Sequence, residues 1–249
     1  MIDFHTHILP NIDDGAESIE ESKRMIEKLQ SQGVSEILFT PHFSSKSRAL
    51  NDFLEERDEK YSMLSASFPE MNFYKGAEVA FNRIKKCDLD YSTLTINNTS
   101  YVLLELPKMS AWHKDIANRI DSICSIYLFK PIIAHVELYK EIQQDISILD
   151  DFIKMGYLLQ MDLDSLNIKS VRKFALKLLE HNYIHIIGSD CHNITSRPPR
   201  YDVGIQTIKE KFGQEKVDYL QNNMKNVLLG KEVQTKKPKK LRKIFGLYF

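Results

Sequence analysis

Side chains that could bind metal ions recur along this chain just after short apolar segments. His5 and His7 follow the first segment as a His-x-His pair, and Asp14 comes a few positions later. Residues two apart on an extended segment point the same way, so both imidazoles can bind one ion. Later segments end at or are followed by further candidates, which are His42, Glu78, Glu105, His135, Asp190 and His192. Imidazole and carboxylate ligands together suit divalent ions such as Zn, Mn or Fe.

The number of candidate ligands bears on the kind of site. A single zinc ion takes about four ligands, so this larger set predicts two or three divalent ions. Paired ions roughly 3.5–4 Å apart activate a water molecule and stabilise the oxygens of a displacement at phosphorus. Phosphoester hydrolysis is therefore the expected chemistry. Two other histidines, His113 and His181, are expected to be ordinary surface residues.

The elements that must position these side chains alternate between short apolar and longer helical patterns. We expect strands at residues 2–5, 35–40, 72–76, 101–106, 131–134, 157–161 and 184–188. Apolar residues recur at helical spacing within residues 19–29, 50–64, 116–127 and 171–178. Seven repeats favour an α/β domain with a parallel sheet closed into a barrel, and an open doubly wound sheet is the alternative. In a barrel the carboxyl ends of the strands meet on one face, where active sites lie.

Composition and charge limit the class of protein. The chain has 249 residues, 43% of them hydrophobic, and a formal net charge of zero. Because six basic residues fall within residues 236–243, the remainder is acidic, and it lacks the basic footprint of a nucleic-acid partner. No signal peptide or membrane span is visible, and Cys87, Cys124 and Cys191 form no C-x-x-C pair, which predicts a cytoplasmic protein. The composition shifts after residue 230, so we expect one domain at residues 1–230 and a basic, aromatic tail at 231–249.

The order of the motifs resembles a known family. The opening MIDFHTHILP and residues 12–15 (IDDG) are similar to the polymerase and histidinol phosphatase (PHP) superfamily, and more closely to the CpsB/YwqE-type bacterial tyrosine phosphatases of capsule and exopolysaccharide loci. Residues 40–42 (TPH), 76–78 (GAE), 103–107 (LLELP), 131–135 (PIIAH), 189–193 (SDCHN) and 197–199 (RPP) continue the resemblance. It spans about residues 1–230.

This resemblance implies a distorted seven-stranded (β/α)7 TIM-like barrel of the PHP type with three metal ions. One ion would be bound by His5, His7 and Asp190, and Glu78 would bridge it to a second, bound also by Glu105 and His135. Asp14, His42 and His192 would bind the third. His42 or His192 could also assist the leaving group as an acid. The implied reaction is hydrolysis of phosphotyrosine, on the tail of a bacterial tyrosine kinase, by a metal-activated hydroxide.

The residues that would bind the substrate phosphate depart from the family pattern. Arg197 is expected to contact the phosphate, but Leu138 stands where the family's His-Pro-Glu-Arg-Tyr motif has its arginine. Leucine cannot make the bidentate contacts of a guanidinium, so either Arg197 or Arg200 compensates, turnover is weakened, or the substrate differs. Asp162 and Asp164 also replace more neutral family residues and would repel an anionic substrate.

Three other functions remain open. Cys191 and Arg197 have the C-x5-R spacing of cysteine-dependent phosphatases, but the loop between them lacks glycine and Asp190 would raise the thiol pKa. Another PHP reaction, on histidinol phosphate or a nucleotide phosphoester, would use the same metal site. The third is a weakly active, metal-loaded module that binds a kinase.

The tail combines basic and aromatic residues within residues 236–249. This pattern suits contact with the anionic inner leaflet of a membrane. The alternatives are a solvated end or apolar packing against the body or another subunit, and the family resemblance is compatible with an oligomer.

Overall fold

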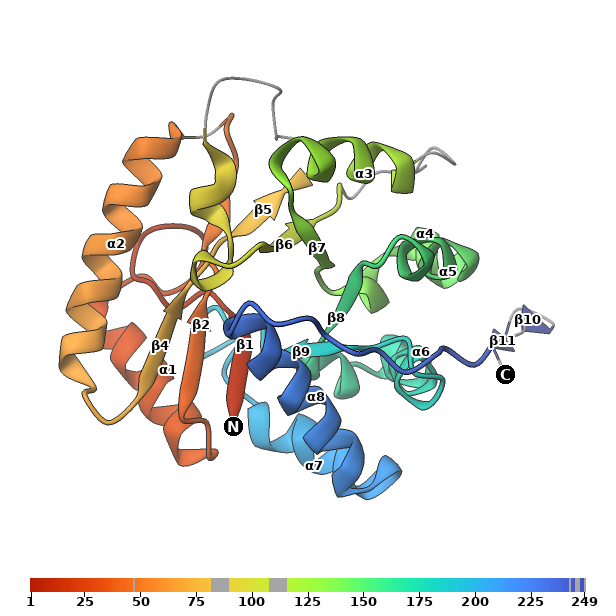
Figure 1. Cartoon of the computed structure of the whole chain (residues 1–249). Helices are drawn as coiled ribbons and strands as arrows, with labels where there is room; N and C mark the ends of the chain where they lie inside the picture. The colour runs from red at the N-terminus through yellow and green to blue at the C-terminus, as the bar shows by residue number, and fades with distance from the viewer. Residues whose placement is uncertain (47, 82–89, 108–115, 242, 245–246, 249) are drawn as a thin grey trace.

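The computed structural model describes the whole chain except residues 47, 82–89, 108–115, 242, 245–246 and 249 (Figure 1). The expectations for Cys87 and His113 lie outside the described residues.

Among the described residues, nine parallel strands in two sheets form the centre of the molecule. The first sheet has the order β1-β2-β4, and the second has the order β3-β5-β6-β7-β8-β9. Their bounds are β1 Ile2–Thr6, β2 Glu36–Phe39, β3 His42–Phe43, β4 Asn72–Lys75, β5 Glu78–Ala80, β6 Tyr101–Glu105, β7 Lys130–Ile133, β8 Leu158–Asp162 and β9 Ile186–Gly188. β1 and β8 are buried along their whole length, as expected for parallel strands covered on both faces.

The two sheets meet along β1 and the segment that follows β9. Asp190 N donates to His5 O at 2.8 Å, and His7 N donates to Cys191 O at 2.9 Å. Thr6 and Cys191 form an isolated parallel bridge there. The strands therefore curve into a half-barrel, and these contacts bring the two ends of the sequence to one place.

The expected count of seven strands is not confirmed. The predicted strands at 35–40 and 72–76 correspond to β2 and β4. The chain leaves the first sheet after each of them, around Pro41 and Ala77, and a short further strand follows. These further strands, β3 and β5, pair with each other in the second sheet. Proline has no N–H to donate to a strand ladder, which explains the first break. The predicted positions of the other strands are confirmed to within a few residues.

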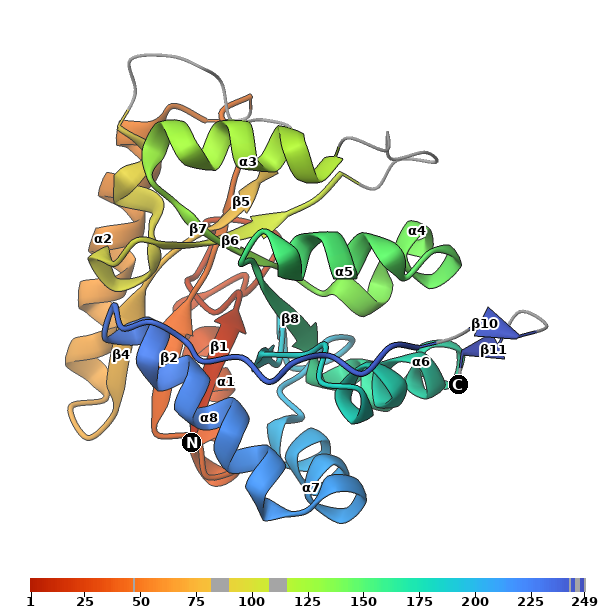
Figure 2. The same ribbon diagram turned by 45° about the vertical axis from the view of Figure 1, so that its right-hand side comes forward.

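Helices cover the strands on the outside (Figures 1 and 2). The four predicted helices are present as α1 Ile19–Ser31, α2 Leu50–Ser67, α3 Ile116–Tyr127 and α6 Lys169–Glu180. Four others were not predicted: α4 Lys140–Gln144, α5 Ser147–Lys154, α7 Tyr201–Phe212 and α8 Gln214–Leu228. In the described part of the chain, short 3-10 helices lie between them, namely η2 Tyr91–Leu94, η3 Ile96–Asn98, η4 Val136–Leu138 and η5 Leu163–Leu166. None of the described helices is long and apolar enough to cross a membrane.

Local chemistry explains where these helices start and stop, as α1 illustrates. The hydroxyl of Ser18 accepts a hydrogen bond from Glu21 N at the first turn, and Met25, Ile26 and Leu29 face the core. Gly33, with φ of +83°, follows the last turn in the left-handed conformation that glycine favours.

The C-terminal segment leaves α8 and runs along the outside of the body to α6 (Figure 2). There it ends in a short antiparallel pair, β10 Lys243–Ile244 and β11 Leu247–Tyr248. His181 was expected to be an ordinary surface residue, but its ring Nδ1 donates to Lys239 O at 3.0 Å and thereby holds this segment.

Candidate metal centre

All nine candidate metal ligands lie in one continuous cluster at the carboxyl ends of the strands. Three overlapping groups have ligand atoms within 4.8 Å of one another: His5, His7 and Asp190; His7, Asp14, His42 and His192; and His42, Glu78 and Glu105. His135 joins them through Glu78, which its Nε2 approaches to 2.9 Å. Residues almost 190 positions apart in the sequence are thus neighbours, because parallel strands end at the same edge.

The first group has the dimensions of a tetrahedral metal site. The Nε2 atoms of His5 and His7 are 3.1 Å apart, and each lies 3.3 Å from Glu78 Oε2. Asp190 Oδ1 lies 3.4 Å from the first nitrogen and 3.3 Å from the second. Four ligands placed 2.0–2.1 Å from a zinc ion in tetrahedral geometry are roughly 3.3 Å apart. These four side chains therefore fit a divalent cation.

Glu78 lies at the junction of the groups. Its side chain is 1% exposed, and its Oε2 is 3.0 Å from His42 Nδ1 while its Oε1 faces His135. A carboxylate with each oxygen directed at a different imidazole can bridge two ions. Glu105, at the end of β6, completes this side of the cluster.

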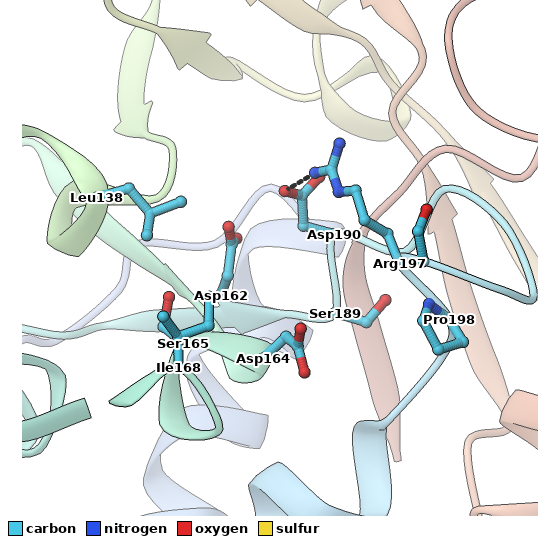
Figure 3. Close-up of a pocket in the computed structure, with 10 residues that line it drawn as sticks. Leu138, Asp162, Asp164, Ser165, Ile168, Ser189, Asp190, Arg197 and Pro198 are labelled. Atoms are coloured by element: carbon cyan, nitrogen blue, oxygen red, sulfur yellow. Dashed lines mark hydrogen bonds and ion pairs between the residues drawn. The ribbon is translucent and has the colours of Figure 1, made fainter. Parts of the chain in front are cut away.

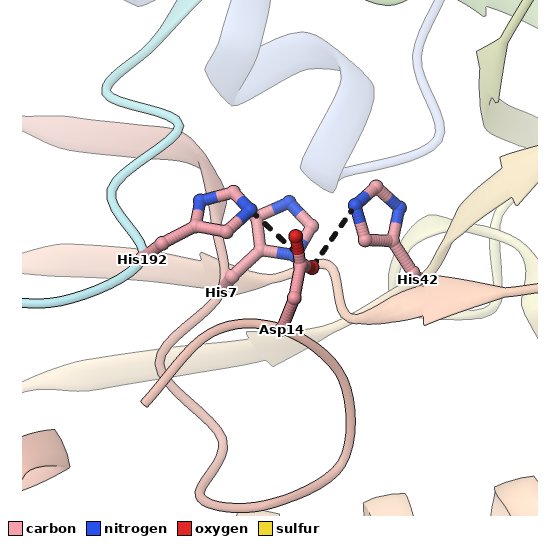
Figure 4. A group of neighbouring side chains, drawn as sticks. All are labelled: His7, Asp14, His42 and His192. Carbon is pink, nitrogen blue, oxygen red and sulfur yellow. Dashed lines mark ion pairs between the residues drawn. The ribbon is translucent and has the colours of Figure 1, made fainter. Parts of the chain in front are cut away.

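The group of His7, Asp14, His42 and His192 surrounds the carboxylate of Asp14 (Figure 4). Asp14 Oδ1 is 3.5 Å from His42 Nε2 and 3.6 Å from His192 Nε2, and its side chain is 68% exposed. His192 Nε2 is buried and has no hydrogen-bond partner among the described residues. A buried ring nitrogen directed at an open carboxylate suits a cation between them.

Side chains that sequence reasoning missed orient the imidazoles. Asp13 Oδ2 accepts from His7 Nδ1 at 2.7 Å, and Gln160 Oε1 accepts from His5 Nδ1 at 3.4 Å. His192 Nδ1 donates to Asp190 O at 3.0 Å. Each bond places the proton on Nδ1 and leaves Nε2 free for a cation, the usual arrangement around metal-binding histidines. Asp13 stands beside Asp14 in the Asp-Asp-Gly segment, which was the only sequence signal for it.

Backbone geometry also directs ligands inward. His135 and Asp190 have φ of 34° and 54°, in the left-handed region that non-glycine residues rarely adopt, and both follow the end of a strand. Gly188 lets β9 approach β1 closely, because a Cβ atom there would lie 2.4 Å from His5 Cβ.

The buried carboxylates of the cluster need positive charge close to them. Burial disfavours ionised Glu78, yet His5, His135 and His42 hold the pKa of its carboxyl well below the usual value. Burial likewise opposes a charge on His135, yet Glu78 raises the pKa of this imidazole to about 10. Protons on imidazole thus offset the buried carboxylates, and a divalent cation would do the same.

A pocket of about 390 Å³ adjoins Asp190 (Figure 3). Arg197 and Pro198 lie on one side of it and Leu138 and Ile168 on the other; the remaining lining residues are Asp162, Asp164, Ser165, Ser189, Asp190 and Ser196. Arg197 forms an ion pair with Asp190 Oδ2 at the junction of pocket and cluster. The pocket therefore opens next to the candidate metal centre.

The two aspartates in this pocket are less repulsive than expected. Asp162 is buried, and burial together with Asp190 and Glu137 raises its pKa well above the usual value, which favours the uncharged carboxyl. Asp164 is paired with Arg200, whose Nη1 lies 3.1 Å from its Oδ1. Arg200 is not itself a lining residue but pairs with Asp164, which is, whereas Arg197 lines the pocket directly.

The alternative in which Cys191 is a nucleophile conflicts with the structure. The Cys191 side chain is 1% exposed. Burial and the nearby Asp3 raise the pKa of its thiol, whereas a nucleophilic cysteine needs a lowered pKa and access to substrate. Cys191 instead contributes its backbone carbonyl to the junction of β1 and β9.

Comparisons with known proteins agree with this geometry. The tyrosine-protein phosphatase YwqE of Bacillus subtilis is 27% identical over 100% of both chains, and the putative tyrosine-protein phosphatase CapC of Staphylococcus aureus is 31% identical over 99% of this chain and 100% of its own. A crystal structure from a study of YwqE and of CpsB from Streptococcus pneumoniae, described there as unique metal-dependent tyrosine phosphatases, superposes with a TM-score of 0.83 at 26% identity. That match covers 96% of this chain and 100% of the other. The family model for capsular polysaccharide synthesis, CpsB/CapC, matches residues 1–229, and the chain therefore belongs to the CpsB/CapC family.

Proposed function

We propose that this chain is a metal-dependent protein-tyrosine phosphatase of a capsule or exopolysaccharide system. The observation that carries the proposal is the cluster of nine ligands around Glu78, whose spacing fits divalent cations and which adjoins a pocket containing an arginine. Membership of a family whose relatives are named tyrosine phosphatases supports the reaction class.

The three ligand groups support two or three bound ions, with His5, His7 and Asp190 in the first, Glu105 and His135 beside Glu78 in the second, and Asp14, His42 and His192 in the third. Such ions, of manganese, zinc or iron, supply a nucleophile at neutral pH and neutralise phosphoryl charge. Asp13 and Gln160 keep the histidine Nε2 atoms directed at them. If β2–β3 and β4–β5 are each taken as one interrupted strand, the framework corresponds to a distorted seven-stranded barrel, within a domain at residues 1–230.

Arg197 is the residue that we assign to the substrate phosphate. Its side chain is 46% exposed and is held by Asp190 in the lining of the pocket, so it can contact a phosphate there through its remaining N–H groups. Arg200 is engaged by Asp164, so in this arrangement it does not replace the missing family arginine. A phenolate leaves more readily than an alkoxide, so His192 or His42 need give it little help as an acid.

The apolar side of the pocket suits the ring of the substrate. Leu138 is 38% exposed and Ile168 is 41% exposed, and both face the pocket opposite Arg197. Contact with an aromatic ring would remove this apolar surface from water. Leu138 stands where the family has an arginine, and its apolar side chain would favour an aryl phosphate over a small polar phosphate ester.

Truncation of Leu138 tests this assignment. We expect Leu138→Ala to raise KM for a phosphotyrosine peptide roughly tenfold, because apolar pocket contacts of this size are worth that factor. Leu128→Ala is the matched control, since this leucine is 81% exposed and does not line the pocket. Equal kinetics for Leu138→Ala and the control would contradict a ring contact at Leu138.

A substrate panel tests the function itself. Phosphate release should be measured with a phosphotyrosine peptide, the same peptide with phosphoserine, histidinol phosphate and a nucleoside monophosphate. The proposal expects kcat/KM to be highest for phosphotyrosine, by about 100-fold or more. Faster hydrolysis of histidinol phosphate or the nucleotide would assign another phosphoesterase reaction. No hydrolysis of any substrate by metal-loaded protein would favour a binding module.

The partner is proposed from the same family membership. A phosphotyrosine protein of the cytoplasm, such as the tail of a membrane-associated tyrosine kinase, fits a family of capsule synthesis. We also propose that the protein can form an oligomer and that the tail at residues 231–249 contacts the membrane surface.

A further inference from the structure

The outer surface of α6 is strongly basic. This helix carries Lys169, Arg172, Lys173 and Lys177 against a single acid, Glu180. Ala175, Leu178 and Leu179 face the core, whereas Lys173 is exposed. In a chain whose formal net charge is zero, such a helix marks an uneven distribution of charge.

The C-terminal segment adds to this charge because it is held against the end of α6. Lys239 N donates to His181 O at 2.9 Å, and His181 Nδ1 donates back to Lys239 O at 3.0 Å. Lys236 N donates to the hydroxyl of Tyr219 at 3.2 Å, and Leu241 is buried. Residues 236–240 thereby present four exposed lysines, Lys236, Lys237, Lys239 and Lys240, beside α6.

A groove of about 300 Å³ lies on the same side of the molecule, between α6 and the end of α7. Its lining residues are Lys173, Leu176, Lys177, Glu180, Lys211 and Phe212. Lys177 is paired with Glu180 at 2.9 Å, so Lys173 and Lys211 carry the uncompensated charge. Leu176 and Phe212 give the groove an apolar floor.

The electrostatic effect of this arrangement is visible at a neighbouring lysine. Burial, and then the nearby Lys236 and Lys239, together lower the pKa of Lys216 to about 8. The lysines of the tail therefore lie close to the body of the protein and add their positive charge to that of its surface.

We infer that α6, the end of α7 and the docked tail form a basic face that binds an anionic lipid bilayer. Seven lysines define this face: Lys173, Lys177, Lys211, Lys236, Lys237, Lys239 and Lys240. The inference extends the peripheral membrane contact proposed above for the tail, and it does not depend on the phosphatase activity, because none of these lysines lines the pocket beside the metal centre.

Charge complementarity and the kind of basic residue favour a bilayer over an acidic protein. Clusters of four to eight basic residues are typical of binding to anionic lipids, whose surface potential attracts each lysine. The ammonium group of lysine is a point charge, whereas the planar guanidinium of arginine can form two parallel hydrogen bonds with one carboxylate. The seven lysines also lie along two helices and an extended segment and do not converge on one pocket. An apolar floor between lysines also suits the boundary of headgroups and acyl chains.

Vesicle co-sedimentation tests the inference with the full chain. Phosphatidylcholine vesicles with and without phosphatidylglycerol should be compared at low and high NaCl. We expect binding only to the anionic vesicles, weakened by salt. Lys173→Gln with Lys211→Gln, and separately Lys239→Gln with Lys240→Gln, should each weaken binding roughly 25-fold, about fivefold for each lysine. Arg24→Gln with Lys28→Gln on α1 is the matched control, since it removes the same charge from exposed positions on another helix.

Three other outcomes would overturn the inference. Equal loss in the control pair would show that net charge, not this face, governs binding. Binding to an acidic peptide but not to vesicles would assign the face to a protein partner. If protein with intact phosphotyrosine hydrolysis bound neither the vesicles nor the acidic peptide, the basic face would not have the proposed role. A lack of hydrolysis with intact vesicle binding would instead count against the proposed enzyme alone.

Discussion

Asp13 offers a sharp test of how the metal centre is built, because it contacts ligands without belonging to the ligand set. Its Oδ2 accepts from His7 Nδ1 at 2.7 Å and from His42 N at 2.8 Å, and its Oδ1 accepts from Gly15 N at 3.0 Å. The side chain is 4% exposed. Burial disfavours the charge, yet the bonds with His7 and the backbone lower the pKa of this carboxyl to about 2. Asp13 therefore remains charged and fixes the imidazole of His7 and the backbone of His42.

The substitution Asp13→Asn keeps the size of the side chain but removes its charge and one acceptor atom. Loss of a partner of this kind typically weakens metal affinity 10–100-fold, or about 1.4–2.7 kcal/mol. Because two bonds at Oδ2 serve the ligands His7 and His42, we expect a value near the middle of this range, about 30-fold.

The assay is a titration of chelator-treated protein with Mn²⁺ or Zn²⁺ against a competing chelator. Asp151→Asn is the control, since this exposed carboxylate pairs with Lys154 on the surface of α5, away from the metal centre. Phosphatase activity of Asp13→Asn should recover at high metal concentration. Unchanged metal affinity in a folded Asp13→Asn protein would refute the positioning role.

Three further predictions concern stability, packing and substrate contact. Burial lowers the pKa of His185 from 6.5 to about 3. As pH falls, this histidine is therefore protonated in the unfolded chain before it is protonated in the folded protein, so the free energy of unfolding decreases below pH 6.5 by about 1.4 kcal/mol per pH unit. Urea unfolding should show a shallower pH dependence for His185→Phe, and an unchanged slope would contradict this role of His185. Gly188→Ala should lower the unfolding free energy by about 1–3 kcal/mol and weaken metal binding, because its Cβ would lie 2.7 Å from His5 N; calorimetry with wild-type stability would argue against this contact. Arg197→Ala should lower kcat/KM about 100-fold, with partial recovery in Arg197→Lys; steady-state rates within threefold of the wild type would remove Arg197 from the phosphate site.

The positions of the strands and the ligand candidates were predictable because both depend on local patterns. Short apolar segments followed by His, Asp or Glu predict where strands end, and parallel strands end together. The structure brings the nine residues named in this way together in one cluster. It overestimated the regularity of the sheet, because a strand that stops at Pro41 and continues in another sheet leaves no mark on the apolar pattern.

The residues that orient the ligands were not predictable in the same way. Gln160 lies within a predicted strand, and only the fold shows that its amide reaches His5 and the backbone of His135. The pairing of Asp164 with Arg200 joins residues 36 positions apart. Such contacts depend on how separate elements pack, which periodicity does not encode.

The most direct test of the account is phosphate release from a phosphotyrosine peptide by untreated protein, by chelator-stripped protein with Mn²⁺ or Zn²⁺ added back, and by Cys191→Ser. The account predicts that activity disappears on stripping, returns with metal and is unaffected by Cys191→Ser. Activity that survives stripping but is lost in Cys191→Ser would contradict the metal centre and favour a cysteine nucleophile.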